Sequence, residues 1–374
     1  MAEQKSDLSR AFDEDGALKT HVGGQALIEG IMMRGKYNWS VAVREPSGGI
    51  YVEEHDLASG RNKNGWMHWP LVRGCRALVE SLVLGYKALE IAALHAFAEE
   101  DEAPASTDES AEASGATGDS SAKKSFMDEE VEFGKKEMAV SMVLGLVLGV
   151  VLFIVAPALI TNLIVGEYDQ NTVLWNIVDG VLRVGVFVFY LWLIGRMQEI
   201  KRMFGYHGAE HKTIHCYEHG LPLTAANARS FPRLHVRCGT AFLIMVMVIA
   251  IFVYTITPLN GLIEMWGVPD GAPKLALVIL VRILLMPVIA GISYEITVKW
   301  AGSHPDNPLV KVVLWPGMQM QYLTTNEPDD GQIECAIAAM QKVLEREQAE
   351  DEKAKAASGV GVPGDADEAA TAAA

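Results

Sequence analysis

The sequence predicts an α-helical membrane protein with four transmembrane helices, one interfacial helix and a small cytoplasmic β-rich module. Three observations support this fold class. Half of the 374 residues are hydrophobic, and four apolar stretches approach the roughly twenty residues that cross a hydrocarbon core. Short β-favouring runs separated by glycine lie near the N-terminus. We therefore expect membrane spans joined to a part that folds in water.

The segments before the first span differ sharply in composition. Residues 1–20 are polar and charged and predict a disordered N-terminus. Residues 21–69 predict the β-rich module, in which Pro46-Ser47-Gly48-Gly49 is a hairpin turn signal. The β-favouring runs of this module are Gln25–Met33, Ser40–Arg44 and Ile50–Glu54.

Residues 70–98 have a helical pattern with leucines on one face and charges elsewhere, which makes a full span doubtful. Trp66 and Trp69 at its start suit a helix in the membrane interface, because indole rings favour the headgroup zone. The alternative is a helix that covers the β-rich module. Residues 99–134 are acidic and poor in large apolar side chains, which predicts a disordered linker.

Four apolar stretches predict the transmembrane helices. Charged side chains interrupt two of them, and burying a charge in the hydrocarbon core costs free energy unless the charge pairs with another group. Asp179 and Arg183 lie in the second stretch and Arg282 in the fourth, so we expect Asp179 or Glu295 to pair with one of the arginines. The predicted spans are residues 138–165, 173–194, 239–257 and 275–293.

Loop charges predict the orientation of the spans. Basic residues precede the first span, follow the second and precede the third, whereas the loop after the first span holds Glu167 and Asp169 without Lys or Arg. By the positive-inside rule, the basic loops and both termini are cytoplasmic. The cytoplasmic segments after the linker are the 195–238 loop, the 294–346 segment and a disordered tail over 347–374.

Charge and cysteine usage exclude two classes of protein. The net charge of −16 comes from acidic ends and the linker, and no basic cluster suggests a nucleic-acid partner. The four cysteines form no C-x-x-C pair, so a disulfide framework is not expected. The N-terminus lacks the apolar core of a secretory signal. The expected partners are the lipid bilayer and either a protein partner or a second copy of the chain.

The best candidate for chemistry is the 195–238 loop, which holds five of the ten histidines. His207 and His211 are four residues apart and would share one face of a helix, with His215 one turn further. The order His207-Gly208-Ala209-Glu210-His211 has the H-x-x-E-H form of an inverted zinc protease motif. We therefore predict a zinc site with His207 and His211 as ligands and Glu210 as the general base.

The third ligand is open between Cys238, His235 and Glu295. Glu29, Arg34, Lys212 and His215 are candidates for substrate binding or for supporting the ligands.

Other interpretations compete with the zinc site. Histidines at the end of a span can be interfacial residues without a ligand, and the cysteines can be buried apolar residues. Gly208 weakens a helix by roughly 1 kcal/mol relative to alanine, so the motif could lie in a turn. For the function, we weigh a metal-dependent hydrolase against a non-catalytic membrane scaffold or assembly factor. A small-molecule transporter would need the charges in the spans to line a pathway.

Several runs of the sequence resemble the bacterial YqhQ family. They are Gly23–Gly35, Tyr206–Thr213, Arg237–Thr240, Ala290–Glu295 and Leu323–Pro328. The resemblance extends from about Val22 to Glu345 and implies a bacterial inner-membrane protein, in a family of unknown function that is sometimes described as predicted metal-dependent enzymes. The family pattern has a proline before the Arg-Cys-Gly-Thr run, where this chain has Val236 between His235 and Arg237.

Overall fold

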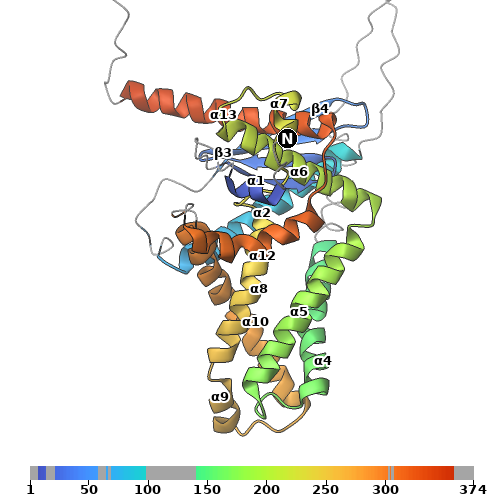
Figure 1. Ribbon diagram of the computed structural model, residues 1–374, viewed down its shortest axis with the longest axis vertical. Helices are drawn as coiled ribbons and strands as arrows, with labels where there is room; N and C mark the ends of the chain where they lie inside the picture. The colour runs from blue at the N-terminus through green and yellow to red at the C-terminus, as the bar shows by residue number, and fades with distance from the viewer. Residues whose placement is uncertain are drawn as a thin grey trace, which may run out of the picture.

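The computed structural model describes residues 7–13, 22–57, 65, 69–97, 140–301, 304 and 307–357. Within these residues the protein has two regions, which Figure 1 shows one above the other. We call the four apolar helices the span bundle, and the described residues within 22–97, 195–238 and 307–357 the head. The predicted linker over 99–134 lies outside the described residues.

The head contains a four-stranded antiparallel sheet in the order β1-β2-β3-β4. The run Gln25–Met33 is two strands rather than one, because Ile28 and Glu29 form a tight turn between Leu27 and Gly30. Glu29 adopts the positive φ of 50° that this turn uses. The strands are β1 (Gly23–Leu27), β2 (Gly30–Arg34), β3 (Asn38–Arg44) and β4 (Ile50–Asp56).

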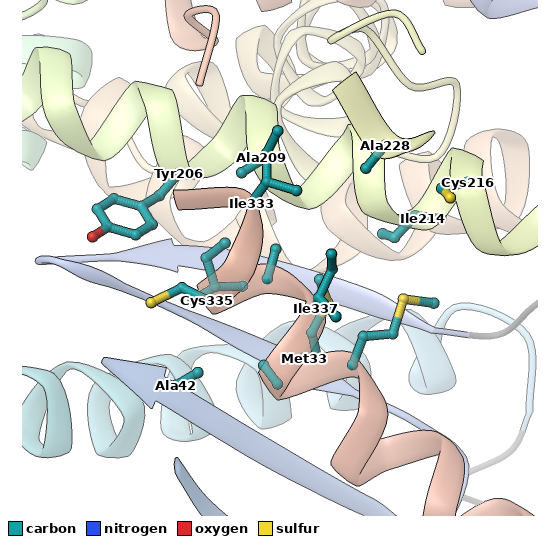
Figure 2. Packing of buried hydrophobic residues seen from close by; sticks show 14 of the residues in the cluster. Met33, Ala42, Tyr206, Ala209, Ile214, Cys216, Ala228, Ile333, Cys335 and Ile337 are labelled. Carbon is teal, nitrogen blue, oxygen red and sulfur yellow. The ribbon is translucent and has the colours of Figure 1, made fainter. Parts of the chain in front are cut away.

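The two faces of the sheet pack against different helices. Side chains alternate along a strand, so Ile31 and Met33 face one side while Met32 faces the other. The first side packs against α6 (Gln198–Glu218) and α13 (Asp330–Ala357), and Figure 2 shows side chains of both helices, such as Ile214 and Ile337, gathered in one cluster with Met33 of the sheet. The buried sheet therefore fixes the position of α6, which carries the candidate ligands.

The other side of the sheet packs against α2 (Val72–Ala96) through Leu84, Ala88 and Ala92. This helix therefore covers the β-rich module, which is one of the two positions that we expected for residues 70–98. Its N-terminal half packs against the fourth span instead, and a Cβ at Gly74 would lie 2.9 Å from the Cα of Gly291. The same half exposes an apolar face beside that span, which fits a position in the membrane interface; its members are Leu78, Val79, Leu82 and Val83.

The four predicted spans are four long apolar helices. The fourth continues beyond the expected end at 293, through the π-helix η3 (Glu295–Trp300). The helices are Val140–Val165, α5 (Thr172–Ile194), α8 (Gly239–Ile256) and Ala272–Trp300. The first contains η2 (Val151–Val155) and α4 (Ala156–Val165), and the fourth begins with α10 (Ala272–Tyr294). Their length and composition make this a membrane protein.

The charges inside the spans pair with each other. Asp179 Oδ2 accepts hydrogen bonds from Arg183, at 2.8 Å, and from Arg282. The Arg282 guanidinium also lies 4.6 Å from the Trp175 ring centroid. The predicted pairing of Asp179 with these arginines is confirmed, whereas Glu295 pairs with Arg73 of α2.

Both ends of the chain contain more structure than the sequence predicts. In the N-terminal segment expected to be disordered, α1 (Asp7–Asp13) forms, because Ala11 is fully buried against Leu234 and Met318. Residues 347–357, expected to belong to a disordered tail, are instead the C-terminal part of α13. The 294–346 segment includes the helix α12 (Pro308–Thr324), and the short helices elsewhere are α7 (Ala225–Arg229) and α9 (Leu259–Met265).

Candidate metal centre

The helix α6, which follows the span α5 into the head (Figure 1), carries the His207–His211 motif. Gly208 does not break this helix. A Cβ at Gly208 would lie 2.1 Å from the backbone oxygen of Asn326, so glycine allows the segment after α12 to approach α6. Packing of α6 against the sheet and α13 outweighs the low helix propensity of glycine.

Three of the predicted ligands converge. His207 and His211 lie on one face of α6, and Cys238 is the N-cap residue of α8. One ligand atom from each of the three lies within 4.8 Å of the other two, and His207 Nε2 is 3.2 Å from Cys238 Sγ. The site therefore joins a helix of the head to the first turn of a membrane span.

Backbone carbonyls orient both imidazoles. His207 Nδ1 is 2.8 Å from the carbonyl oxygen of Thr324, and His211 Nδ1 is 2.6 Å from that of Arg233. If each Nδ1–H donates to its carbonyl, each Nε2 presents a lone pair, which is the usual arrangement of a metal-binding histidine. His211 Nε2 is buried and makes no hydrogen bond of normal geometry within the described residues.

Burial sets the charge states of the site. Burial lowers the pKa of His211 to about 4, which keeps this imidazole neutral near pH 7. Burial alone would raise the pKa of the Cys238 thiol, but His211 and the hydrogen bonds from Thr240 outweigh it and lower this pKa. A neutral imidazole and an acidified thiol are the forms that bind a transition metal.

Glu210 lies beside these ligands and packs against the first strand. A Cβ at Gly24 would lie 2.8 Å from Glu210 Cδ, so glycine leaves room for the carboxyl group. Burial raises the pKa of Glu210 to about 7, and Oε2 makes no hydrogen bond within the described residues. A buried carboxyl group with a free oxygen and a pKa near neutrality suits proton transfer.

His235 and His215 belong to a second group rather than to the His207 site. Their ligand atoms and a carboxylate oxygen of Glu218 lie within 4.8 Å of one another. The sequence did not single out Glu218 or Arg237 as site residues, although the spacing of His215 and Glu218 places them on one helix face. Arg237 could not be found by spacing, because it meets Glu218 only through the fold.

Glu295, the remaining candidate ligand, is not brought to the His207 site. The Arg73 guanidinium binds both carboxylate oxygens of Glu295 and holds them against the start of α2. The Leu71 amide donates a further hydrogen bond to this carboxylate. Of the three residues that competed for the third position, Cys238 is the one whose ligand atom lies within 4.8 Å of those of His207 and His211.

The candidate substrate-binding residues are dispersed. Glu29 and Arg34 lie at opposite ends of β2 and have separate charged partners, Arg202 and Glu80. The structure therefore does not bring them to one ligand, because a short strand separates them. Lys212 is nearly buried and has three oxygen partners: the carbonyls of Arg229 and Phe231, and the carboxylate of Glu327. It holds the loop before α8 in place.

Comparison with known proteins gives one family. The family described as "Protein of unknown function (DUF1385)" matches residues 69–346, which include α6, Cys238 and all four spans. The chain belongs to this family. It is also 29% identical over 333 residues to the "Uncharacterized protein YqhQ" of Bacillus subtilis (strain 168), covering 89% of this chain and 95% of that protein. The resemblance to the YqhQ family is thus confirmed, and no solved structure matches the chain.

Proposed function

We propose that this protein is a membrane-embedded, zinc-dependent hydrolase with its site at the cytoplasmic end of the spans. In this proposal His207, His211 and Cys238 bind the metal, and Glu210 is the general base. The observation that carries the proposal is the convergence of three ligand atoms within 4.8 Å of one another. Atoms bonded to one zinc ion at about 2.0–2.3 Å must lie this close together.

The donor set fits zinc. Two imidazoles and one thiolate are ligands that zinc prefers, and three protein ligands leave a fourth position for water or substrate. Both histidines already have the carbonyl partners that fix a metal-binding tautomer. The buried Nε2 of His211, which has no hydrogen-bond partner among the described residues, is a further sign, because a buried lone pair without a partner is costly.

The remaining chemistry would come from the chain itself. When bound, zinc supplies Lewis acidity that lowers the pKa of a coordinated water molecule. Glu210 would accept the proton from that water and return it to the leaving group, for which its raised pKa of about 7 is suited. His207 is the only partly exposed member of the three ligands, so substrate would enter beside it.

The cellular location follows from the basic loops. Arg196, Lys201 and Arg202 follow the second span on the head side, while Glu167 and Asp169 lie in the loop at its far end. Under the positive-inside rule the head is cytoplasmic in a bacterial inner membrane. A cytoplasmic position would keep Cys238 reduced and able to bind metal.

The test combines metal analysis with hydrolysis assays on the protein purified in detergent. The wild type should bind zinc and hydrolyse some member of a panel of ester, phosphoester and peptide substrates. Glu210→Gln should keep the zinc and lose hydrolysis. A folded wild-type protein that binds no zinc would overturn the proposal and favour the non-catalytic scaffold.

A further inference from the structure

A second group of ligand-type side chains lies further along α6. His215 and Glu218 project from one face of the helix, and His235 comes from the loop before α8. Their side chains are at most 3% exposed, and their ligand atoms lie within 4.8 Å of one another. The group shares no residue with the His207 site.

His215 has a free nitrogen inside this group. Its Nε2 lies 2.9 Å from the carbonyl oxygen of Leu234, which fixes the ring and leaves Nδ1 as the nitrogen with a lone pair. Nδ1 is buried and makes no hydrogen bond to any described residue. A buried and unpartnered ring nitrogen beside a carboxylate and a second imidazole indicates a missing ligand rather than a packed core.

Glu218 supplies the negative charge of the group. One of its carboxylate oxygens pairs with Arg237, and the other lies 3.4 Å from His235 Nε2. The distance of 3.4 Å is long for a hydrogen bond, so this second oxygen is only weakly engaged. The positive charge of Arg237 lowers the free-energy cost of burying the Glu218 carboxylate, and it leaves the second oxygen able to bind a metal ion.

We propose that His215, Glu218 and His235 bind a second divalent transition-metal ion, separate from the zinc of the His207 site. The donor set is two imidazole nitrogens and one carboxylate oxygen, without sulfur. Such a set accepts Zn²⁺, Fe²⁺, Mn²⁺ or Co²⁺ and leaves coordination positions open. Because the two sites share no ligand, either one can be occupied without the other.

Binding requires one rearrangement at His235. The Arg237 amide lies 3.2 Å from His235 Nδ1, so the ring proton of the metal-free protein is on Nε2. A metal ion at Nε2 moves this proton to Nδ1 and breaks the amide contact, with no net gain or loss of protons. Arg237 precedes Cys238, and the His211 and His235 ring centroids are 5.6 Å apart. A metal ion in one site should therefore change the metal affinity of the other site, although each can be occupied alone.

Cobalt can distinguish the two sites because only the first contains sulfur. The full-length protein in detergent is freed of metal and titrated with Co²⁺, while bound cobalt per chain and the near-ultraviolet thiolate-to-cobalt band are recorded. The wild type should bind two cobalt ions and show the band. Cys238→Ser should lose the band and keep one ion, and Glu218→Gln should keep the band and lose one ion.

A matched control comes from the same helix. His219 is an imidazole next to the group, but its Nδ1 is 2.7 Å from the backbone oxygen of His215 and it belongs to neither site. His219→Gln should therefore keep two ions. His215→Ala gives a second test that leaves the Glu218–Arg237 pair intact, and it should also lose one ion while the band stays.

The outcomes separate this inference from the proposed function. One cobalt ion in the wild type with the thiolate band, or two ions in both Glu218→Gln and His215→Ala, would overturn the second site. One ion without the band would support the second site and contradict the zinc site. Loss of both ions in Cys238→Ser, with unchanged melting temperature, would also overturn a separate second site.

Discussion

Glu210 is a buried acid whose protonation should depend on the metal. Its pKa is raised to about 7, so in the metal-free protein it is mostly protonated at roughly pH 6 and mostly ionised at roughly pH 8. A nearby metal ion favours the carboxylate and therefore releases the proton. We expect zinc binding near pH 6 to release more protons from the wild type than from Glu210→Gln.

This difference in proton release should vanish near pH 8, where the wild-type carboxyl group is already ionised. Calorimetric titrations in two buffers with different ionisation enthalpies measure the protons released. Equal release by the two proteins near pH 6 would show that Glu210 does not sense the metal.

Gly208 should control the affinity of the site without contacting the metal. In Gly208→Ala the new Cβ would meet the Asn326 oxygen at 2.1 Å, so the segment that holds the Thr324 carbonyl must shift. His207 then loses its orienting hydrogen bond. Loss of such a partner typically weakens metal binding by about 10- to 100-fold.

A competition assay with a zinc-binding dye measures this loss of affinity. Gly145→Ala in the first span is the control, since a Cβ there meets nothing within 4 Å. Unchanged zinc affinity in Gly208→Ala would contradict the role given to the Thr324 carbonyl.

The ligands differ in how far the sequence could predict them. His207 and His211 follow from helical periodicity, which is a local property of the chain. The choice among Cys238, His235 and Glu295 depends on how α8, α10 and α2 pack, and no spacing rule contains that information. Glu295 instead binds Arg73, which is distant in sequence, and spacing could not predict that contact.

At the scale of elements, α13 should carry much of the stability of the head. Met340 is fully buried in the cluster formed by α6, the sheet and α13. Its replacement by alanine leaves a cavity and should lower the free energy of unfolding by about 2–5 kcal/mol. Lys353→Ala, on an exposed part of the same helix, should change it by less than about 0.5 kcal/mol.

Denaturant titration in detergent, followed by circular dichroism, compares the two variants. A Met340→Ala protein as stable as Lys353→Ala would show that α13 does not hold the head together.

Helices and strands were predictable where composition alone decides them. The spans follow from about twenty apolar residues, and the strands of the head follow from β-favouring runs and turn residues. The end of α13 and the helix α1 were missed because their sequences are polar. Ala11 is ordered by contacts with Leu234 and Met318, which come from other parts of the chain.

At the scale of the whole molecule, the head and the far loops should lie on opposite sides of the membrane. Glu352 is exposed on α13 in the head, and Glu264 is exposed on α9 at the other end of the span bundle (Figure 1). In intact cells, a membrane-impermeant maleimide should label Glu264→Cys, and it should label Glu352→Cys only after permeabilisation. Protein without an added cysteine measures the labelling of the native cysteines. Labelling of Glu352→Cys in intact cells, with Glu264→Cys labelled only after permeabilisation, would contradict a cytoplasmic head.

The proposed metal site lies where the two regions of the molecule meet. Its histidines come from α6 of the head, and Cys238 is the N-cap residue of the span α8, so a bound zinc ion would tie α6 to α8. The carbonyl of Thr324, at the end of α12, holds His207 from a third direction. The arrangement of the spans therefore decides whether the ligand set is complete.

X-ray absorption at the zinc edge tests the central claim most directly, because it identifies the atoms bonded to the metal. Protein loaded with one equivalent of zinc should show a sulfur neighbour at about 2.3 Å together with imidazole nitrogens at about 2.0–2.1 Å. The sulfur neighbour should disappear in Cys238→Ser. A wild-type protein whose zinc has no sulfur neighbour, or a sulfur neighbour that persists in Cys238→Ser, would contradict the His207–His211–Cys238 site.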